Sequence, residues 1–264
     1  MRSIYTKALW DQRRSLPAWA SALALMVFLE AAMWPSLSDM SELDAYLDDF
    51  PSALKEVFSI DQMSTGQGFL NAELFTLMLP MMFVVFGVLH GARMVAGEEA
   101  AGTLDLLLVT PLSTTRFLVE EALALTTSLA ALGAAVFTAT ILGSAAFGLQ
   151  VSVVAALSGS LAVTLLGLEF GVLALAIGAL TGRRGLALGL TSALGLATYV
   201  LYVAGMFVDA LSPWRVLSPF DQALSAGPLA PDLPASMLWL VVVSVLACLA
   251  VLPLWARRDI GASS

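Results

Sequence analysis

The segment SVVAALSGSLAVTLLGLEFGVLALAIGALT, residues 152–181, holds a single charged residue, Glu169, in thirty consecutive positions. A helix of about 20 mostly apolar residues is long enough to cross the hydrocarbon core of a bilayer. The segment therefore predicts a membrane-spanning helix. Five other segments share its apolar character and predict five more spans: residues 16–37, 73–92, 118–147, 186–208 and 236–256. Within residues 73–92, Pro80 predicts a kink.

The bulk composition agrees with a chain that lies mostly in lipid. Hydrophobic residues make up 59% of the 264 positions and charged residues 12%, with a mean hydropathy of +0.89. A soluble domain of this length needs more charge to cover its surface. We therefore predict an all-α integral membrane protein, in which residues 1–264 form one transmembrane domain of six helices.

Two residue types that often carry chemistry occur once each, as Cys248 and His90. An intramolecular disulfide, a cysteine metal cluster and a histidine-based metal site are therefore excluded, and a Ser-His-Asp triad is disfavoured. We expect no metal site. His90 falls at the inner end of its span, where an interfacial role suits it better than a proton relay.

The basic residues predict the orientation of the six spans. With the N-terminus inside, only Lys55 and Arg215 fall outside, and ten of the twelve Lys and Arg residues fall in the cytoplasm. This bias follows the positive-inside rule and places both termini in the cytoplasm, with the chain in the plasma (inner) membrane. The cytoplasmic set is Arg2, Lys7, Arg13, Arg14, Arg93, Arg116, Arg183, Arg184, Arg257 and Arg258. An aromatic belt would then have Trp10, Trp19 and Trp255 at the inner interface and Trp34, Trp214 and Trp239 at the outer one.

Two longer loops are predicted on the outer side, residues 38–72 and 209–235. The first is strongly acidic, which favours either a solvated loop or, less strongly, a surface that attracts cations or a basic partner. Its acids are Asp39, Glu42, Asp44, Asp48, Asp49, Glu56, Asp61 and Glu73. Repeated prolines in the second forbid a continuous helix, so short helices, a partly re-entrant cap or a plain loop remain.

Residues 1–15 predict an amphipathic helix at the inner membrane surface. At about 100° per residue, Lys7, Asp11 and Arg14 share one face. Tyr5, Leu9 and Leu16 share the opposite, apolar face. Such a helix would lie along the interface before the first span begins.

The segment VAGEEAAGTLDLLLVTPLSTTR, residues 95–116, contains an apolar patch that is too short to cross a bilayer. Within it, residues 98–112 predict a short cytoplasmic helix that ends at Pro111. Leu104, Leu107 and Leu108 share one face of that helix. The acidic pair Glu98 and Glu99 lies near its start, where negative charge favours the helix dipole. Either the helix rests on lipid headgroups as a connector or it forms a docking surface.

Residues 92–121, ARMVAGEEAAGTLDLLLVTPLSTTRFLVEE, resemble the signature region of ABC-2 type transporter permeases. The family pattern E-x-x-G-T-L-x-x-L-L-x-x-P-x-S is matched at Glu99, Gly102, Thr103, Leu104, Leu107, Leu108, Pro111 and Ser113. In that family this stretch is the coupling helix that docks on an ATPase subunit. One departure is that family members usually carry a lysine shortly after the motif, where this chain has Glu120 and Glu121.

The resemblance implies a permease subunit of an ATP-driven transporter, expected to be an exporter by analogy with the family, that forms its path as a dimer. The expected partners are a separate ABC ATPase subunit, a second copy of the chain or a related permease, and membrane lipids, with no nucleic acid. The chain has no G-x-x-x-x-G-K-[ST] loop, so we expect it to bind no cofactor and to be no enzyme itself. ATP and Mg would be bound by the ATPase subunit. The apolar spans weakly favour a hydrophobic or amphipathic cargo.

Two acids inside the spans, Glu169 and Glu30, are candidate pathway residues. A charge in mid-span costs several kcal/mol unless it is paired or protonated, so Glu169 either faces a pathway or is protonated and bonded to a neighbouring helix. Glu30 lies nearer the outer end of its span. Glycine pairs four residues apart favour close helix packing within the chain or, less strongly, a dimer seam. The pairs are Gly167 with Gly171, Gly178 with Gly182, and Gly185 with Gly189.

Two other classes of function remain open. An ion-coupled secondary transporter would use Glu169 and Glu30 and would need no ATPase. A membrane-embedded enzyme acting on lipids would need clustered acids, histidines or serines at the membrane surface. The cytoplasmic loops offer only Glu98 and Glu99 for that purpose.

Overall fold

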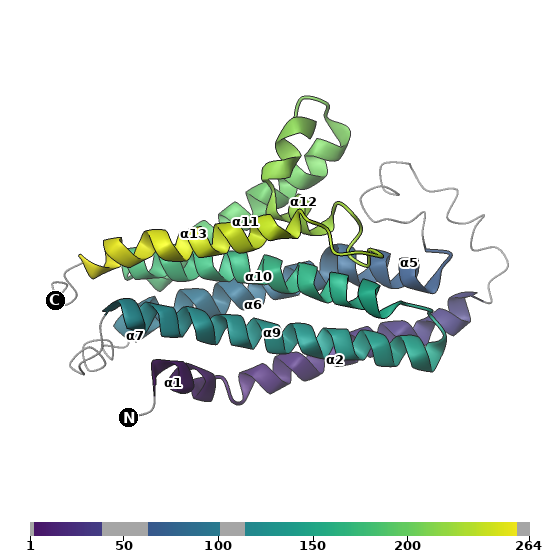
Figure 1. Ribbon diagram of the computed structural model, residues 1–264, viewed down its shortest axis with the longest axis horizontal. Coiled ribbons are helices and arrows are strands. Elements are labelled where there is room, and N and C mark those ends of the chain that lie inside the picture. Colours follow the sequence, from purple (N-terminus) through teal and green to yellow (C-terminus); the bar gives the residue numbers. More distant parts are fainter. Residues whose placement is uncertain (1–2, 39–62, 101–113, 258–264) are drawn as a thin grey trace.

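The computed structural model describes residues 3–38, 63–100 and 114–257, and the elements that it contains there are helical. Six helical segments in this part of the chain are long and apolar enough to cross a membrane, which confirms the predicted fold class. They are Ser15–Ser38, Gly66–Met94, Thr115–Phe147, Val153–Thr181, Arg184–Phe207 and Met237–Trp255. Figure 1 shows them as an elongated bundle in which the start of α1 and the end of α13 lie at the same end.

The first span, α2 (Ser15–Ser38), follows a short N-terminal helix, α1 (Ile4–Asp11). The oxygen of Ser3 caps α1 by accepting a hydrogen bond from the Thr6 amide. The helix ends at Asp11, so Arg14 and Leu16 do not belong to the amphipathic surface predicted for residues 1–15. Its buried side chains are Ile4 and Ala8, one turn apart, because α1 packs against the bundle along that edge.

The second span is a continuous helical run of three parts: α5 (Gly66–Leu70), the π-helical η2 (Asn71–Met78) and α6 (Leu79–Met94). It begins earlier than residue 73. Pro80 lies in the first turn of α6, directly after the widened π turns, where its missing N–H costs no α-helical bond. The Thr76 hydroxyl donates to the Asn71 carbonyl at 2.8 Å, which occupies an acceptor of the widened turn. The disruption expected from Pro80 thus takes the form of a changed hydrogen-bond pattern.

The centre of the bundle is α10 (Val153–Thr181), the most buried of the spans. It packs against α6, α9 (Thr114–Phe147), α11 (Arg184–Phe207) and α13 (Met237–Ala256). Its contact with α6 is the most extensive in the described structure.

Glycines on both helices allow α6 and α10 to approach closely. A methyl group placed on Gly87 would overlap the carbonyl oxygen of Gly167, and one on Gly91 would overlap that of Gly171. The spacing of four residues on both helices therefore serves packing within the chain at this crossing. The other predicted pairs behave differently: Gly182 ends α10 with a φ of 65°, whereas Gly185 and Gly189 of α11 have open space beside them.

Two short helices interrupt the proline-rich segment 209–235, namely η3 (Ser212–Leu217) and α12 (Pro219–Leu224). The segment is therefore not a plain loop. Arg215 is paired with Asp221 at 2.8 Å and lies over the ring of Tyr202, which ties the two short helices to α11. Figure 1 shows the end of α11 leaving the main bundle in this region.

The structure changes two predictions about the bundle surface, one for Trp255 and one for Glu73. Trp255 is fully buried beside Phe117, with ring centroids 5.5 Å apart, and so belongs to the core instead of an exposed aromatic belt. Of the acids assigned to the first external loop, Glu73 lies within η2, and the others fall outside the described residues.

Candidate functional site

The candidate site lies where α1, the end of α6, the short helix α7 (Ala96–Ala100) and the start of α9 meet. It flanks the segment predicted to be a coupling helix. Of the eight residues assigned to that function, Glu98 and Glu99 lie in the first turn of α7. The remaining residues, Gly102, Thr103, Leu104, Leu107, Leu108 and Pro111, lie outside the described part of the chain.

α7 begins after a break in the preceding helix at Val95, whose φ and ψ are −97° and −58°. Val95 and Ala96 are fully buried, so the start of α7 is fixed against the bundle. The Glu99 amide donates to the Val95 carbonyl at 3.1 Å and closes the first turn. The acidic pair is thereby held at a defined position next to α1.

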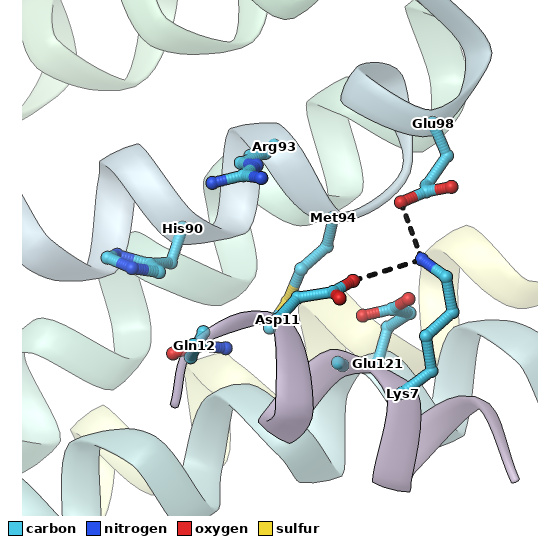
Figure 2. Close-up of a pocket in the computed structure, with 9 residues that line it drawn as sticks. Lys7, Asp11, Gln12, His90, Arg93, Met94, Glu98 and Glu121 are labelled. Carbon is cyan, nitrogen blue, oxygen red and sulfur yellow. Dashed lines mark hydrogen bonds and ion pairs between the residues drawn. The ribbon is translucent and has the colours of Figure 1, made fainter. Parts of the chain in front are cut away.

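An ion-pair cluster joins α1 to α7. The Lys7 ammonium is 2.8 Å from Oε1 of Glu98 and 3.1 Å from Oδ2 of Asp11 (Figure 2). Burial by itself would lower the pKa of Lys7, but the hydrogen bonds to Glu98 and Asp11 outweigh it and raise that pKa above its usual 10.5. Lys7 therefore stays charged and holds Glu98 at any physiological pH.

A second set of contacts joins α1 to α9. The Tyr5 amide donates to Oε2 of Glu120 at 3.1 Å, and the Tyr5 hydroxyl lies 3.1 Å from the hydroxyl of Thr127. Arg116 donates to Oε1 of the same Glu120 at 2.8 Å. The hydrogen bonds from Arg116 and from the Tyr5 amide stabilise the charged carboxylate, which fixes α1 on the first two turns of α9.

α1 therefore holds both flanks of residues 101–113. Lys7 binds Glu98 just before that segment, and Tyr5 binds Glu120 just after it. The sequence had named Lys7 and Glu98 separately, but their separation of 91 positions gives no local pattern that would pair them. In the sequence, only the acidic pair Glu120 and Glu121, at a place where the family usually has a lysine, indicated that the start of α9 has unusual contacts.

Glu121 and His90 line the same site. Glu121 is only 4% exposed, and its Oε2 has no hydrogen-bond partner among the described residues. His90 stacks on Phe86 and its Nδ1 is 2.9 Å from the Phe86 carbonyl oxygen. Both contacts lie within α6, so they fix the His90 ring along its own helix.

The two candidate pathway acids are not brought together. Glu169 is 3% exposed within α10, and no hydrogen bond to its Oε2 is found in the part of the chain that the structure describes. Glu30 is partly exposed on α2, and its electrostatic neighbour is Glu73 of η2. The structure thus offers no joint site for the pair, and the hydrogen bond expected for a structural Glu169 is not made by this oxygen.

These features define a class: a multi-pass α-helical membrane protein in which α1 contacts both α7 and α9 at the end of the bundle where α1 begins and α13 ends. A family model described as ABC-2 family transporter protein matches residues 2–252, nearly the whole chain, and the chain belongs to that family. It is therefore a membrane-spanning permease component of an ABC transporter, which in bacteria resides in the plasma membrane. Proteins of this family act with an ABC ATPase. No curated protein matches the chain.

Proposed function

We propose that this chain forms the translocation path of an ATP-driven exporter as a dimer, with ATP and Mg bound by separate ATPase subunits. The termini and residues 98–112 would face the cytoplasm, where the ATPase subunits are. Glu98, Glu99, Gly102, Thr103, Leu104, Leu107, Leu108 and Pro111 would form the docking surface.

The observation that carries the proposal is the clamp of α1 on both flanks of residues 101–113. A docking segment transmits the movement of its partner only if contacts join it to the spans. The ion pair of Lys7 with Glu98 and the hydrogen bond of Tyr5 to Glu120 supply that junction. A connector that merely rests on lipid needs no such attachment at both ends.

The dimer has support in the exposed faces of the outer spans. In α2, α11 and α13, only 17%, 22% and 22% of the most apolar window is buried within one copy, against 67% in α10. Their apolar faces are open to lipid and to a second copy alike, and a path between two copies would use part of this surface.

Co-purification with a separately encoded ABC ATPase subunit tests the proposal. Glu99→Lys and Leu107→Asp should each weaken co-purification and uncouple ATP hydrolysis, while insertion into the membrane stays intact. Asp209→Lys is the matched control, because Asp209 is exposed beyond the far end of α11 and should have no effect. Unchanged co-purification and hydrolysis in both variants would remove the docking role. Transport by the chain alone in proteoliposomes, without ATP, would favour an ion-coupled mechanism instead.

A further inference from the structure

A small cavity lies beneath the ion-pair cluster of Lys7. α1, α6, α7 and α9 all contribute to its lining, and its volume is about 40 Å³. A water-sized group needs roughly 10–15 Å³ of such space, so the cavity leaves room for the end of a flexible side chain to change position. Figure 2 shows Lys7, Glu98 and Glu121 converging on it from three different helices.

Lys7 has the means to serve more than one acceptor in this cavity. Its ammonium has three N–H donors on a flexible four-carbon stem. Glu98 and Asp11 account for two of those donors. Asp11 lies on the same helix, so its bond does not change when helices move relative to one another. Glu98 is the partner that a movement of α7 would withdraw.

Glu121 lies next to this lysine and has a side-chain oxygen that no described donor contacts. Its Oε2 is buried and has no hydrogen-bond partner among the described residues, which costs about 1–3 kcal/mol for a buried polar group. Arg93 also lines the cavity, but its guanidinium points away from Glu121 in Figure 2. Lys7 acts on Glu121 electrostatically already in this arrangement. The charged groups that act on Glu121 are Lys7 and Asp11 from α1, Glu98 from α7 and Glu120 from α9. His90 and Arg93 from α6 line the same cavity.

We propose that Glu121 is the second acceptor of Lys7, which exchanges its bond to Glu98 for one to Glu121 when α7 moves away from α1. Lys7 thereby changes from a link between α1 and α7 into a further link between α1 and α9. Tyr5 keeps α1 on Glu120 in both arrangements. α1 and α9 then move as one unit, while the part of α7 that follows the buried Val95 and Ala96 and carries Glu98 moves separately.

The exchange has a physical basis in the balance of the two arrangements. Withdrawal of Glu98 alone would leave a partly buried ammonium with only the exposed Asp11, in an i,i+4 pair of the kind that contributes little to stability. The nearby Oε2 of Glu121, which has no hydrogen-bond partner among the described residues, compensates for that loss, and its own burial penalty falls when it gains a donor. Two arrangements of similar free energy are what a switching element requires. The proposed function supplies the movement of α7, whereas the exchange itself requires only that Glu98 be withdrawn.

The reactivity of Lys7 toward an amine-acetylating reagent tests the exchange in the purified full chain. The chain has only two lysines, so Lys55 gives an internal reference for mass spectrometry. In Glu98→Gln and in Glu121→Gln, Lys7 should be acetylated as slowly as in the wild type, because one of the two carboxylates remains to hold the ammonium. In the double variant the rate should rise about fivefold or more relative to Lys55, since only the weak pair with Asp11 is left.

The controls separate this result from a general loss of structure. Glu99→Gln combined with Glu121→Gln changes the same number of charges and should leave the rate unchanged. Glu98→Asp, with and without Glu121→Gln, repeats the test with a charge retained, in case the neutral double variant does not fold. The proposal is overturned if Glu98→Gln alone exposes Lys7 as fully as the double variant does, or if the double variant reacts like the wild type. No ATPase subunit is present, so this outcome is independent of whether the docking role holds.

Discussion

Replacing Gly87 by alanine should force α6 and α10 apart at the centre of the bundle. The added methyl group would overlap the carbonyl oxygen of Gly167 and lie 3.1 Å from the carbonyl carbon of Gly167 and 3.2 Å from the amide nitrogen of Gly171. All three are backbone atoms of a buried helix, so no side-chain rotation can relieve the contact. The helices must separate along their most extensive interface.

The size of the effect follows from the cost of overpacking a filled interior, which is about 1–3 kcal/mol. We expect the upper end of this range, because the obstacle is backbone. For a chain of this length, each kcal/mol lowers the unfolding midpoint by roughly 2–4 °C, so a cost of about 3 kcal/mol should lower the midpoint by roughly 6–12 °C.

The assay is the temperature at which the purified chain loses its monodisperse gel-filtration peak, measured for wild type and variants in the same detergent. Gly189→Ala is the matched control, because Gly189 lies in a helix of similar length with open space beside it. There the methyl group removes the flexibility of a helical glycine and should be neutral or stabilising by about 0.5–1 kcal/mol. Equal midpoints for Gly87→Ala and Gly189→Ala would refute the close-packed crossing.

Four further outcomes are expected. Glu120→Ala should release α1 from α9 and make the chain more sensitive to proteolysis near residue 12. Arg116→Ala should have a smaller effect, because it leaves the hydrogen bond from the Tyr5 amide to Glu120 in place. Equal digestion of the two variants would contradict this. Gly182→Ala places a side chain at a φ of 65° and should lower stability by about 1 kcal/mol, measured as the same melting midpoint; an unchanged midpoint would argue against the left-handed cap. Lys7→Met should lower the melting midpoint by the same amount at every pH from about 7 to 9. The reason is that the raised pKa of Lys7 keeps the ion pair until the pH passes above 10.5. A difference between the midpoints of wild type and variant that shrinks within that pH range would contradict the raised pKa. Glu169→Gln should preserve expression and transport if that carboxyl is structural, whereas normal expression with lost transport would favour a pathway role.

The membrane character and the six spans were readable from the sequence, because hydrophobic runs of the required length report directly on burial in lipid. The family was readable for a different reason: the pattern from Glu99 to Ser113 is local and needs no knowledge of the fold. The ends of elements were less accurate. The second span starts at Gly66, because π-helical hydrogen bonding extends the helix through polar residues such as Asn71 and Glu73 that hydropathy assigned to a loop.

Sequence reasoning predicted the burial of single side chains wrongly where the same residue type occurs in two different environments. Tryptophan near the end of a span suggests an interfacial belt, yet Trp255 is fully buried because Phe117 at the start of α9 packs on it. Similarly, the glycine pairs of α10 and α11 look alike in sequence. Only the position of α6 shows that Gly167 and Gly171 lie in a close helix crossing, while Gly185 and Gly189 do not.

The sequence by itself determined that this protein lies in a lipid bilayer, how many spans it has and to which family it belongs. Each of these depends on composition or on a contiguous pattern. The tertiary structure decided the surroundings of the predicted coupling segment. Lys7 and Glu98, and likewise Tyr5 and Glu120, are far apart in the chain and meet only because α1 folds back onto α7 and α9. The same folding buries Glu121 beside Lys7 without a hydrogen-bond donor for its Oε2. Long-range pairing of this kind leaves no periodicity in the sequence, because it depends on how whole helices pack.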